Sequence, residues 1–161
     1  MARALVLVLV AVLAACDRFP ADPDGTTERV RGGELRVGAM HAPPFVVLTA
    51  DGPTGAEAAI AAALADELEA GITWVEGGPD ALLAALEDRA LDLVIGGVTA
   101  DTPWSEQVAL TRPYLRADDA PDGKDHVLAL PPGENRWLMT VERFLAESVE
   151  PAAPELAEAG L

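Results

Sequence analysis

Cysteine is almost absent from the sequence, and its scarcity excludes two common ways of stabilising a small domain. Cys16 is the single cysteine of the 161-residue chain, so neither an internal disulfide nor a cysteine-based zinc site can form. The two histidines, His41 and His126, lack a neighbouring acidic pair, so no metal site and no cofactor is predicted. Half of the residues are apolar, which is enough for one domain with its own core.

Basic residues are scarce as well. The chain has 11 lysines and arginines against 27 aspartates and glutamates, and its formal net charge is −16. A surface of this sign repels nucleic acid and anionic lipid headgroups, so neither is expected as a partner. Taken alone, the acidity indicates only a soluble surface.

Sequence signatures of catalysis are missing too. Ser105 lies in no GxSxG motif and has no histidine beside it. The carboxylates Glu76, Asp101 and Glu106 form no acid–base pair that the sequence identifies. The sequence therefore predicts a protein that is not an enzyme.

No hydrophobic run is long enough to cross a membrane as a helix. The run from Ala4 to Ala15 is shorter than the roughly 20 residues that a bilayer requires. It follows an arginine and ends in small residues, as a secretory signal peptide does. The sequence LAAC, which ends at Cys16, also resembles the lipobox of bacterial lipoproteins. An ordinary secretory signal beside a chance cysteine is the alternative.

The lipobox resemblance implies that residues 1–15 are removed and that Cys16 carries a lipid that anchors the mature chain in the cell envelope. Asp17 resembles the residue that retains Gram-negative lipoproteins in the inner membrane. It predicts the periplasmic face of that membrane if the host is Gram-negative. Residues 16–33 are rich in proline, glycine and charge, and are predicted to be a tether.

Residues 34–148 are predicted to form one α/β domain, followed by a loosely ordered tail over residues 149–161. Short apolar strands alternate with amphipathic helices, a pattern typical of a mostly parallel sheet with helices on both faces. Strands are expected within 34–40, 72–75, 91–95, 107–115 and 126–132, and helices within 56–70, 77–90 and 133–148. The segment DGPTG, residues 51–55, is expected to be a turn.

Four segments over residues 33–115 resemble, in order, the first lobe of the family 3 extracellular solute-binding proteins, the amino-acid receptors of ABC importers. They are GELRVGAMHAPPF, DGPTGAEAAIAAALADEL, TWVEGGPDALLAALEDRALDLVIGGVT and VALTRPYL. The resemblance implies the periplasmic binding protein fold, which traps ligand between two lobes, and a permease or sensor as partner. HVLALPPGENRWLMTVERFLAE resembles the end of the same lobe. Only the loop 116–125 stands where the family's second lobe would be, so a single lobe is expected.

Ligands of open α/β sheets lie beyond the carboxyl ends of the strands. By the resemblance, Trp104 stands where the family has an arginine that pairs with the ligand carboxylate, and Thr99 keeps a hydroxyl. Gly96 and Gly97 are expected to allow a close backbone approach or a positive φ. The predicted ligand-binding residues are His41, Phe45, Gly97, Thr99 and Trp104.

Three functions follow from these features. The first is a lipid-anchored single-lobe relative of importer receptors that binds a small polar, amino-acid-like solute, weakly or within an assembly. The alternative is a membrane-anchored docking protein whose open face, with Trp104 at its centre, binds a partner protein or a second copy. The third is a decayed receptor without a ligand. Convergent polar groups around Thr99 favour the first function, and a flat apolar patch favours the second.

Overall fold

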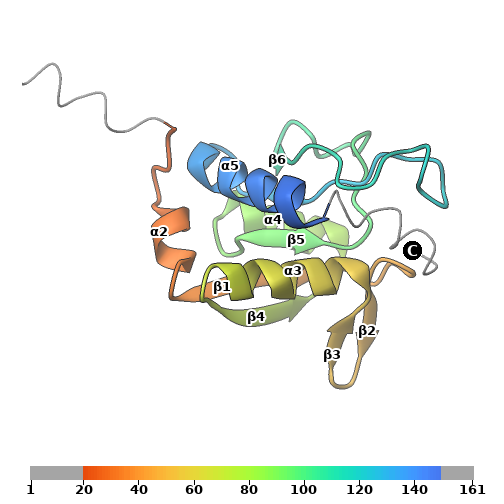
Figure 1. Ribbon diagram of the computed structural model, residues 1–161, viewed down its shortest axis with the longest axis horizontal. Helices are drawn as coiled ribbons and strands as arrows, with labels where there is room; N and C mark the ends of the chain where they lie inside the picture. The colour runs from red at the N-terminus through yellow and green to blue at the C-terminus, as the bar shows by residue number, and fades with distance from the viewer. Residues whose placement is uncertain (1–19, 150–161) are drawn as a thin grey trace, which may run out of the picture.

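A five-stranded sheet runs through the computed structural model, which describes residues 20–149 (Figure 1). The strands lie in the order β4-β1-β5-β7-β6. β4 and β5 flank β1 in parallel, and β7 and β6 complete the sheet in antiparallel pairing. The predicted α/β fold with a mostly parallel sheet is therefore confirmed. The elements are α2 (Thr26–Val30), β1 (Glu34–Ala39), β2 (Val47–Thr49), β3 (Gly52–Thr54), α3 (Ala56–Glu67), β4 (Gly71–Glu76), α4 (Pro79–Glu87), β5 (Leu93–Ile95), β6 (Ala109–Leu110), β7 (Ala129–Leu130), α5 (Asn135–Phe144) and the π-helical turn η2 (Leu145–Val149).

Several sequence predictions fall outside the described residues. These are the signal peptide, the lipidated Cys16, the sorting residue Asp17 and all of the predicted tail beyond Val149. No helix within residues 20–149 is both long enough and apolar enough to cross a membrane.

Helices cover both faces of the sheet, because its strands are apolar on both sides. α3 and α5 pack on one face, where Leu64 and Trp137 join a cluster that includes Ile95 of β5. α4 packs on the other face, where Leu82 contacts a smaller cluster that includes Val94 of the same strand. Figure 1 shows α3 and α5 in front of the sheet and α4 behind it. This double coverage explains why the central strands are continuous apolar runs in the sequence.

A small hairpin separates β1 from α3, where the sequence predicts only a turn. β2 pairs with β3 in antiparallel register, with Thr49 opposite Gly52. The hairpin projects from the body of the domain (Figure 1). Gly52 has a φ of 115°, in the region that favours glycine. The predicted turn over residues 51–55 therefore contains the whole second strand of the hairpin, β3, and the residue on either side of it.

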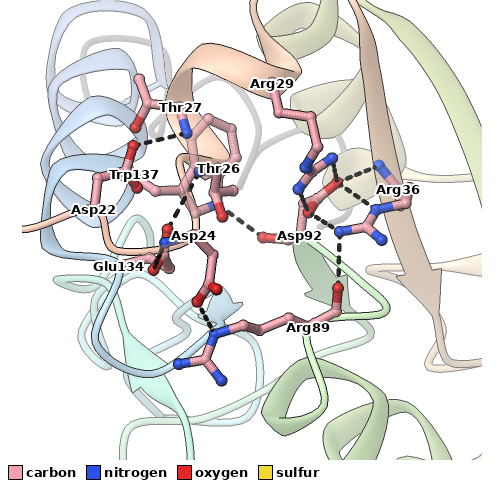
Figure 2. A network of polar contacts seen from close by, with 10 residues as sticks. All are labelled: Asp22, Asp24, Thr26, Thr27, Arg29, Arg36, Arg89, Asp92, Glu134 and Trp137. Carbon is pink, nitrogen blue, oxygen red and sulfur yellow. Dashed lines mark hydrogen bonds and ion pairs between the residues drawn. The ribbon is translucent and has the colours of Figure 1, made fainter.

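The segment before β1 packs on the domain, so the predicted tether over residues 16–33 is wrong for the part that the structure describes. Thr26 and Val30 of α2 are buried. Glu134, buried at the start of α5, accepts hydrogen bonds from the backbone N–H groups of Asp24 at 3.1 Å and of Thr26 at 3.3 Å (Figure 2). The prolines, glycines and charges of this segment suggested a solvated linker. Its backbone N–H groups are instead hydrogen-bonded to a side chain of the domain.

Asp92 lies at the centre of this contact (Figure 2). It is fully buried directly before β5, and its carboxylate accepts hydrogen bonds from the guanidinium groups of Arg29 in α2 and Arg36 in β1. Its backbone carbonyl accepts the indole N–H of Trp137 at 2.8 Å. Burial by itself would raise the pKa of Asp92, but the hydrogen bonds from Arg36 and Arg29 lower it below its ordinary value. Through its carboxylate and its backbone carbonyl, one buried aspartate thus joins α2, β1 and α5 to the start of β5.

A second buried carboxylate, that of Glu57 near the start of α3, holds the turn after β5. The backbone N–H groups of Gly96 and Gly97 donate to it at 2.5 and 3.1 Å, and the hydroxyl of Tyr114 donates to it at 2.5 Å. Burial raises the pKa of Glu57, and these three donors oppose the rise because they favour the ionised form. Glu57 therefore links α3 to the end of β5 and to the segment that follows β6.

The paired glycines of this turn behave as predicted. Gly97 has a φ of 67°, which favours glycine. A side chain at Gly96 would overlap with Met40. A Cβ on Gly97 would lie 3.2 Å from the ring of Phe45. Neighbouring side chains of the domain therefore fill the space that the two glycines leave free.

Substitution Asp92→Asn is expected to destabilise the domain by about 2–3 kcal/mol, because it removes a charged acceptor from two guanidinium groups. The lowered pKa of Asp92 also makes its contribution depend on pH. That contribution is complete above the ordinary aspartate pKa of about 4 and is lost as the pH falls through the lower folded-state value.

Urea unfolding of the variant at pH 7 and at pH 3 tests this expectation. The stability difference from the parent should shrink at the lower pH. Asp118→Asn, in an exposed loop, is the matched control and should change stability by less than about 0.5 kcal/mol. An equal loss in both variants would contradict the role assigned to Asp92.

Substitution Glu57→Gln is expected to cost about 1–3 kcal/mol, since an amide cannot accept all three hydrogen bonds and its NH₂ group meets donors. Glu67→Gln is the matched control, because Glu67 is exposed on the same helix. Thermal unfolding measures both effects, and hydrogen exchange of the Gly96 and Gly97 amides reports the turn. Unchanged protection of those amides in Glu57→Gln would contradict the assignment.

Candidate functional site

A cleft of about 410 Å³ opens at the carboxyl ends of β1 and β5, the edge of the sheet where the sequence predicts a ligand site. Three segments meet there: the residues after β1, the start of α4 and the chain that follows β5. The loop 116–125 adds one more residue. The lining residues are Met40, His41, Pro79, Leu83, Gly96, Gly97, Val98, Thr99, Asp101, Thr102, Pro103, Trp104 and Lys124.

Four of the five predicted ligand-binding residues line this cleft: His41, Gly97, Thr99 and Trp104. Phe45 does not. It is buried at 6 % exposure, and its ring centroid lies 4.0 Å from that of His126. Phe45 thus belongs to the core beside the cleft, while ligand contact by the other four residues stays a prediction.

The four residues offer different chemistry. The backbone N–H of Gly97 is already bonded to Glu57, so it is not free to bind a ligand. His41 is exposed, and its Nδ1 accepts the backbone N–H of Leu48 at 3.3 Å. Trp104 is half-buried, because it packs against the cluster under α4 while it also lines the cleft. Trp104 therefore has a structural and a surface role at once.

The polar groups of the cleft form a short chain. The hydroxyl of Thr99 donates to Asp101 Oδ1 at 2.5 Å, and Lys124 Nζ lies 3.5 Å from Asp101 Oδ2. The hydrogen bond from Thr99 and the charge of Lys124 both lower the pKa of Asp101. The cleft consequently presents one carboxylate and one ammonium group side by side.

The sequence did not identify Lys124 or Glu57 as residues of interest. Lys124 lies in a charged loop whose sequence indicates only a link between two strands. The tertiary structure places it beside the residues after β5. Glu57 reads as an ordinary acidic residue in the first turn of a helix. The signal that could have marked it is the pair of glycines 39 residues later, whose amides need an acceptor.

His126 is buried at 1 % exposure, and its Nε2 lies 3.0 Å from Asp122 Oδ1. His126 is therefore a buried, hydrogen-bonded side chain of the domain. Among residues 20–149, no three histidine, cysteine, aspartate or glutamate side chains are grouped so that they could hold a metal ion.

The profile of the bacterial extracellular solute-binding proteins, family 3, matches residues 35–150 of this chain. A comparison with curated protein sequences gives no match. The family match covers the sheet except for the first residue of β1, and all helices from α3 to η2.

Solved structures agree with the family match. The arginine-bound form of domain 1 from TmArgBP is 26 % identical, with a TM-score of 0.65, over 74 % of this chain and 97 % of that one. An ancestral cationic amino acid solute-binding protein is 18 % identical, with a TM-score of 0.68, over 84 % and 98 %. An ancestral cyclohexadienyl dehydratase is 15 % identical, with a TM-score of 0.69, over 84 % and 95 %.

The two ancestral proteins are too distant in sequence to carry more than the fold, and they include both a binding protein and an enzyme. Domain 1 of TmArgBP is one lobe, and the present chain covers almost all of it. The chain belongs to the bacterial extracellular solute-binding proteins of family 3, and it forms a single lobe of the periplasmic binding protein fold.

Proposed function

We propose that this chain is a lipid-anchored, single-lobe solute-binding protein that holds an amino acid in the cleft at the carboxyl ends of β1 and β5. The observation that carries the proposal is the convergence of Thr99, Asp101 and Lys124 on that cleft. Few, well-placed polar groups in a concave site are typical of small-molecule binding. With the cleft open on one side, we expect weak binding, or tighter binding within an assembly.

The alternative, a docking protein with a flat apolar face, has less support. Among the residues that the structure describes, the exposed large hydrophobic side chains are Val75 and Met139. Neither lines the cleft. Trp104, expected at the centre of a docking patch, is half-buried beside charged groups. A polar cleft fits a solute better than a protein surface.

A single lobe is enough to bind a ligand in at least one relative. The solved structure of domain 1 from TmArgBP is described as the arginine-bound form of that domain. Arginine and other amino acids are therefore the first solutes to test on the present chain.

We expect no catalysis by this chain. The carboxylate of Asp101 is exposed and paired with Lys124. Both oxygens of the buried Glu57 already accept hydrogen bonds, from Gly96, Gly97 and Tyr114. Glu57 therefore has no free acceptor, and Asp101, although it lines the cleft, has a pKa that Thr99 and Lys124 lower, away from the range in which a general acid or base works at neutral pH. The likeness to a dehydratase is one of fold and does not change this expectation.

The proposed anchor is a lipid on Cys16, and the proposed partner is a transporter permease or a sensor in the same membrane. Both proposals rest on the LAAC sequence and on the family to which the chain belongs. The location that follows is the cell envelope, at the periplasmic face of the inner membrane if the host is Gram-negative.

Thermal unfolding of the chain from Asp17 onward, with each of the twenty amino acids, tests the binding function. A bound amino acid at about 100 times its Kd should stabilise the protein by about 2.7 kcal/mol, which raises Tm in a dose-dependent way. Quenching or enhancement of Trp104 fluorescence should accompany the shift and should disappear in Trp104→Phe. A flat Tm across the whole panel, together with a dimer in light scattering, would favour the docking alternative.

Metabolic labelling with palmitate tests the anchor. The full-length chain should incorporate the label and sediment with membranes, and Cys16→Ser should do neither. Ser105→Ala, an exposed substitution in the domain, is the control and should be labelled like the parent. Membrane association of Cys16→Ser without label would indicate an uncleaved signal peptide in place of the lipid.

A further inference from the structure

Arginines gather on the outer side of α5, although the chain as a whole is strongly acidic. Arg112, Arg136 and Arg143 line a hollow of about 480 Å³ together with Met139. Arg112 comes from the segment after β6, and the other three residues come from α5. We call these four residues the arginine face. Its positive charge contrasts with the formal net charge of −16 of the whole chain.

The positive charges of the arginine face are turned to solvent. Arg143 is exposed. Arg112 pairs with Glu142 at 3.2 Å, but its side chain is 76 % exposed, whereas that of Glu142 is 17 % exposed. That pair therefore presents mainly its guanidinium group. Among residues 20–149, no carboxylate lies within 4.0 Å of the guanidinium nitrogens of Arg136 or Arg143.

Met139 adds apolar surface at the centre of this face. Its side chain is 56 % exposed, and Val75 is the other large hydrophobic residue that is exposed within residues 20–149. Arg136, Met139 and Arg143 follow one another at spacings of three and four residues, so they lie on the same side of the helix. Apolar residues flanked by arginines on one helix are typical of helices that lie at a membrane surface.

The start of the domain lies beside the arginine face. Pro20 lines the same hollow, and the carbonyl of Ala21 accepts the backbone N–H of Arg136 at 2.9 Å. Pro20 is four positions after Cys16 in the sequence. The proposed lipid on Cys16 would therefore hold the arginine face close to the lipid headgroups.

We propose that the arginine face docks on the anionic headgroups of the bilayer, with its guanidinium groups on lipid phosphates and Met139 among the headgroups. The planar fork of an arginine matches the oxygens of a phosphate. The inference rests on the proposed lipid anchor, which brings this face to the membrane, while the contacts themselves belong to the folded domain.

The net charge predicts repulsion from such a bilayer for the surface as a whole, and acidic residues border the arginine face on both sides. Asp22 and Glu28 line the hollow beyond Arg136, and Glu147 lines the hollow beyond Arg143. At physiological ionic strength, salt screens charges that are more than about 8 Å apart. The residues in contact with the headgroups therefore matter more than the acidic residues on other faces.

This balance makes docking depend on the anchor. Three arginines are fewer than the clusters that hold a protein on an anionic membrane by themselves. An anchor raises the effective concentration of the domain at the surface, so that weak contacts are enough. We therefore expect the arginine face to dock when the chain is tethered, and the untethered chain to stay in solution.

A fluorophore at position 139 tests the docking. The chain from Asp17 onward contains no cysteine, so Met139→Cys can be labelled at one site with an NBD group. The emission of NBD rises and shifts to the blue when water is excluded from it. An N-terminal histidine tag binds this chain to a nickel-chelating lipid, which takes the place of the lipid proposed on Cys16.

Vesicles of two compositions separate charge from simple tethering. Phosphatidylcholine mixed with phosphatidylglycerol should give the emission change, and phosphatidylcholine alone, with the same chelating lipid, should not. High salt should reverse the change, because it screens the headgroups. Val75→Cys, labelled in the same way on the edge strand β4, is the matched control. It should respond to neither vesicle.

A substitution assigns the effect to the arginines. In the Met139-labelled chain, Arg143→Gln should lower the ratio of docked to undocked domains about fivefold, the effect of one arginine near an anionic surface. Arg116→Gln is the matched control, because Arg116 is exposed and lies outside the arginine face. It should leave the ratio unchanged. Thermal unfolding verifies that both variants are folded.

Each other outcome contradicts the inference. An equal emission change on neutral and anionic vesicles would exclude the role of the arginines, and no change on either would exclude docking. A change that grows with the density of protein on neutral vesicles would indicate a second copy as the partner.

The experiment also separates this inference from the proposed function. Because the chelating lipid supplies the tether, a negative result leaves amino-acid binding and the lipid on Cys16 intact. If Cys16 incorporates no palmitate, the proposed anchor fails, and the vesicle experiment still decides whether the arginine face binds anionic lipid.

Discussion

The buried carboxylate of Glu57 is the interaction on which both the core and the cleft depend. A carboxylate far from water must be hydrogen-bonded on each oxygen, and here the donors come from the turn after β5 and from Tyr114. Because Glu57 accepts all of these hydrogen bonds at once, α3 is fixed against the turn after β5 and against the segment that carries Tyr114. Thr99 and Asp101 follow directly after the same turn. Glu57, which is buried out of reach of any ligand, therefore determines where these polar groups of the cleft lie.

Asp92 does at the start of β5 what Glu57 does beyond its end. Its side chain accepts hydrogen bonds from two arginines, and its backbone carbonyl accepts one from Trp137 of α5 (Figure 2). The short central strand is thereby held at both ends by hydrogen bonds to a buried carboxyl group, and along its length by apolar packing on both faces. A lobe that lacks the support of a second lobe gains a defined core in this way.

The sequence predicted the parts of the fold that local pattern controls. Apolar periodicity located α3, α4 and α5, and the alternation of elements predicted the parallel strands and the edge of the sheet at which a cleft opens. Prediction from the sequence failed where contacts between residues far apart in the chain determine the structure. The polar segment before β1 resembles a linker until its partners Glu134 and Asp92 are in place. Phe45 was expected near the ligand from its position after β1, but the turn of the chain buries it. Lys124 came from a loop whose place over the cleft no local pattern encodes.

The packing of α2 changes how far the domain could move from a membrane. The carbonyl of Ala21 accepts the backbone N–H of Arg136 at 2.9 Å, so the chain is attached to the domain from that residue onward. Five residue steps from Cys16 to Ala21 span at most about 17 Å. The proposed lipid on Cys16 would therefore keep Ala21, and with it the start of α5, within about this distance of the bilayer. Under the proposed function, a domain held this close would meet its partner only by diffusion within the plane of the same membrane.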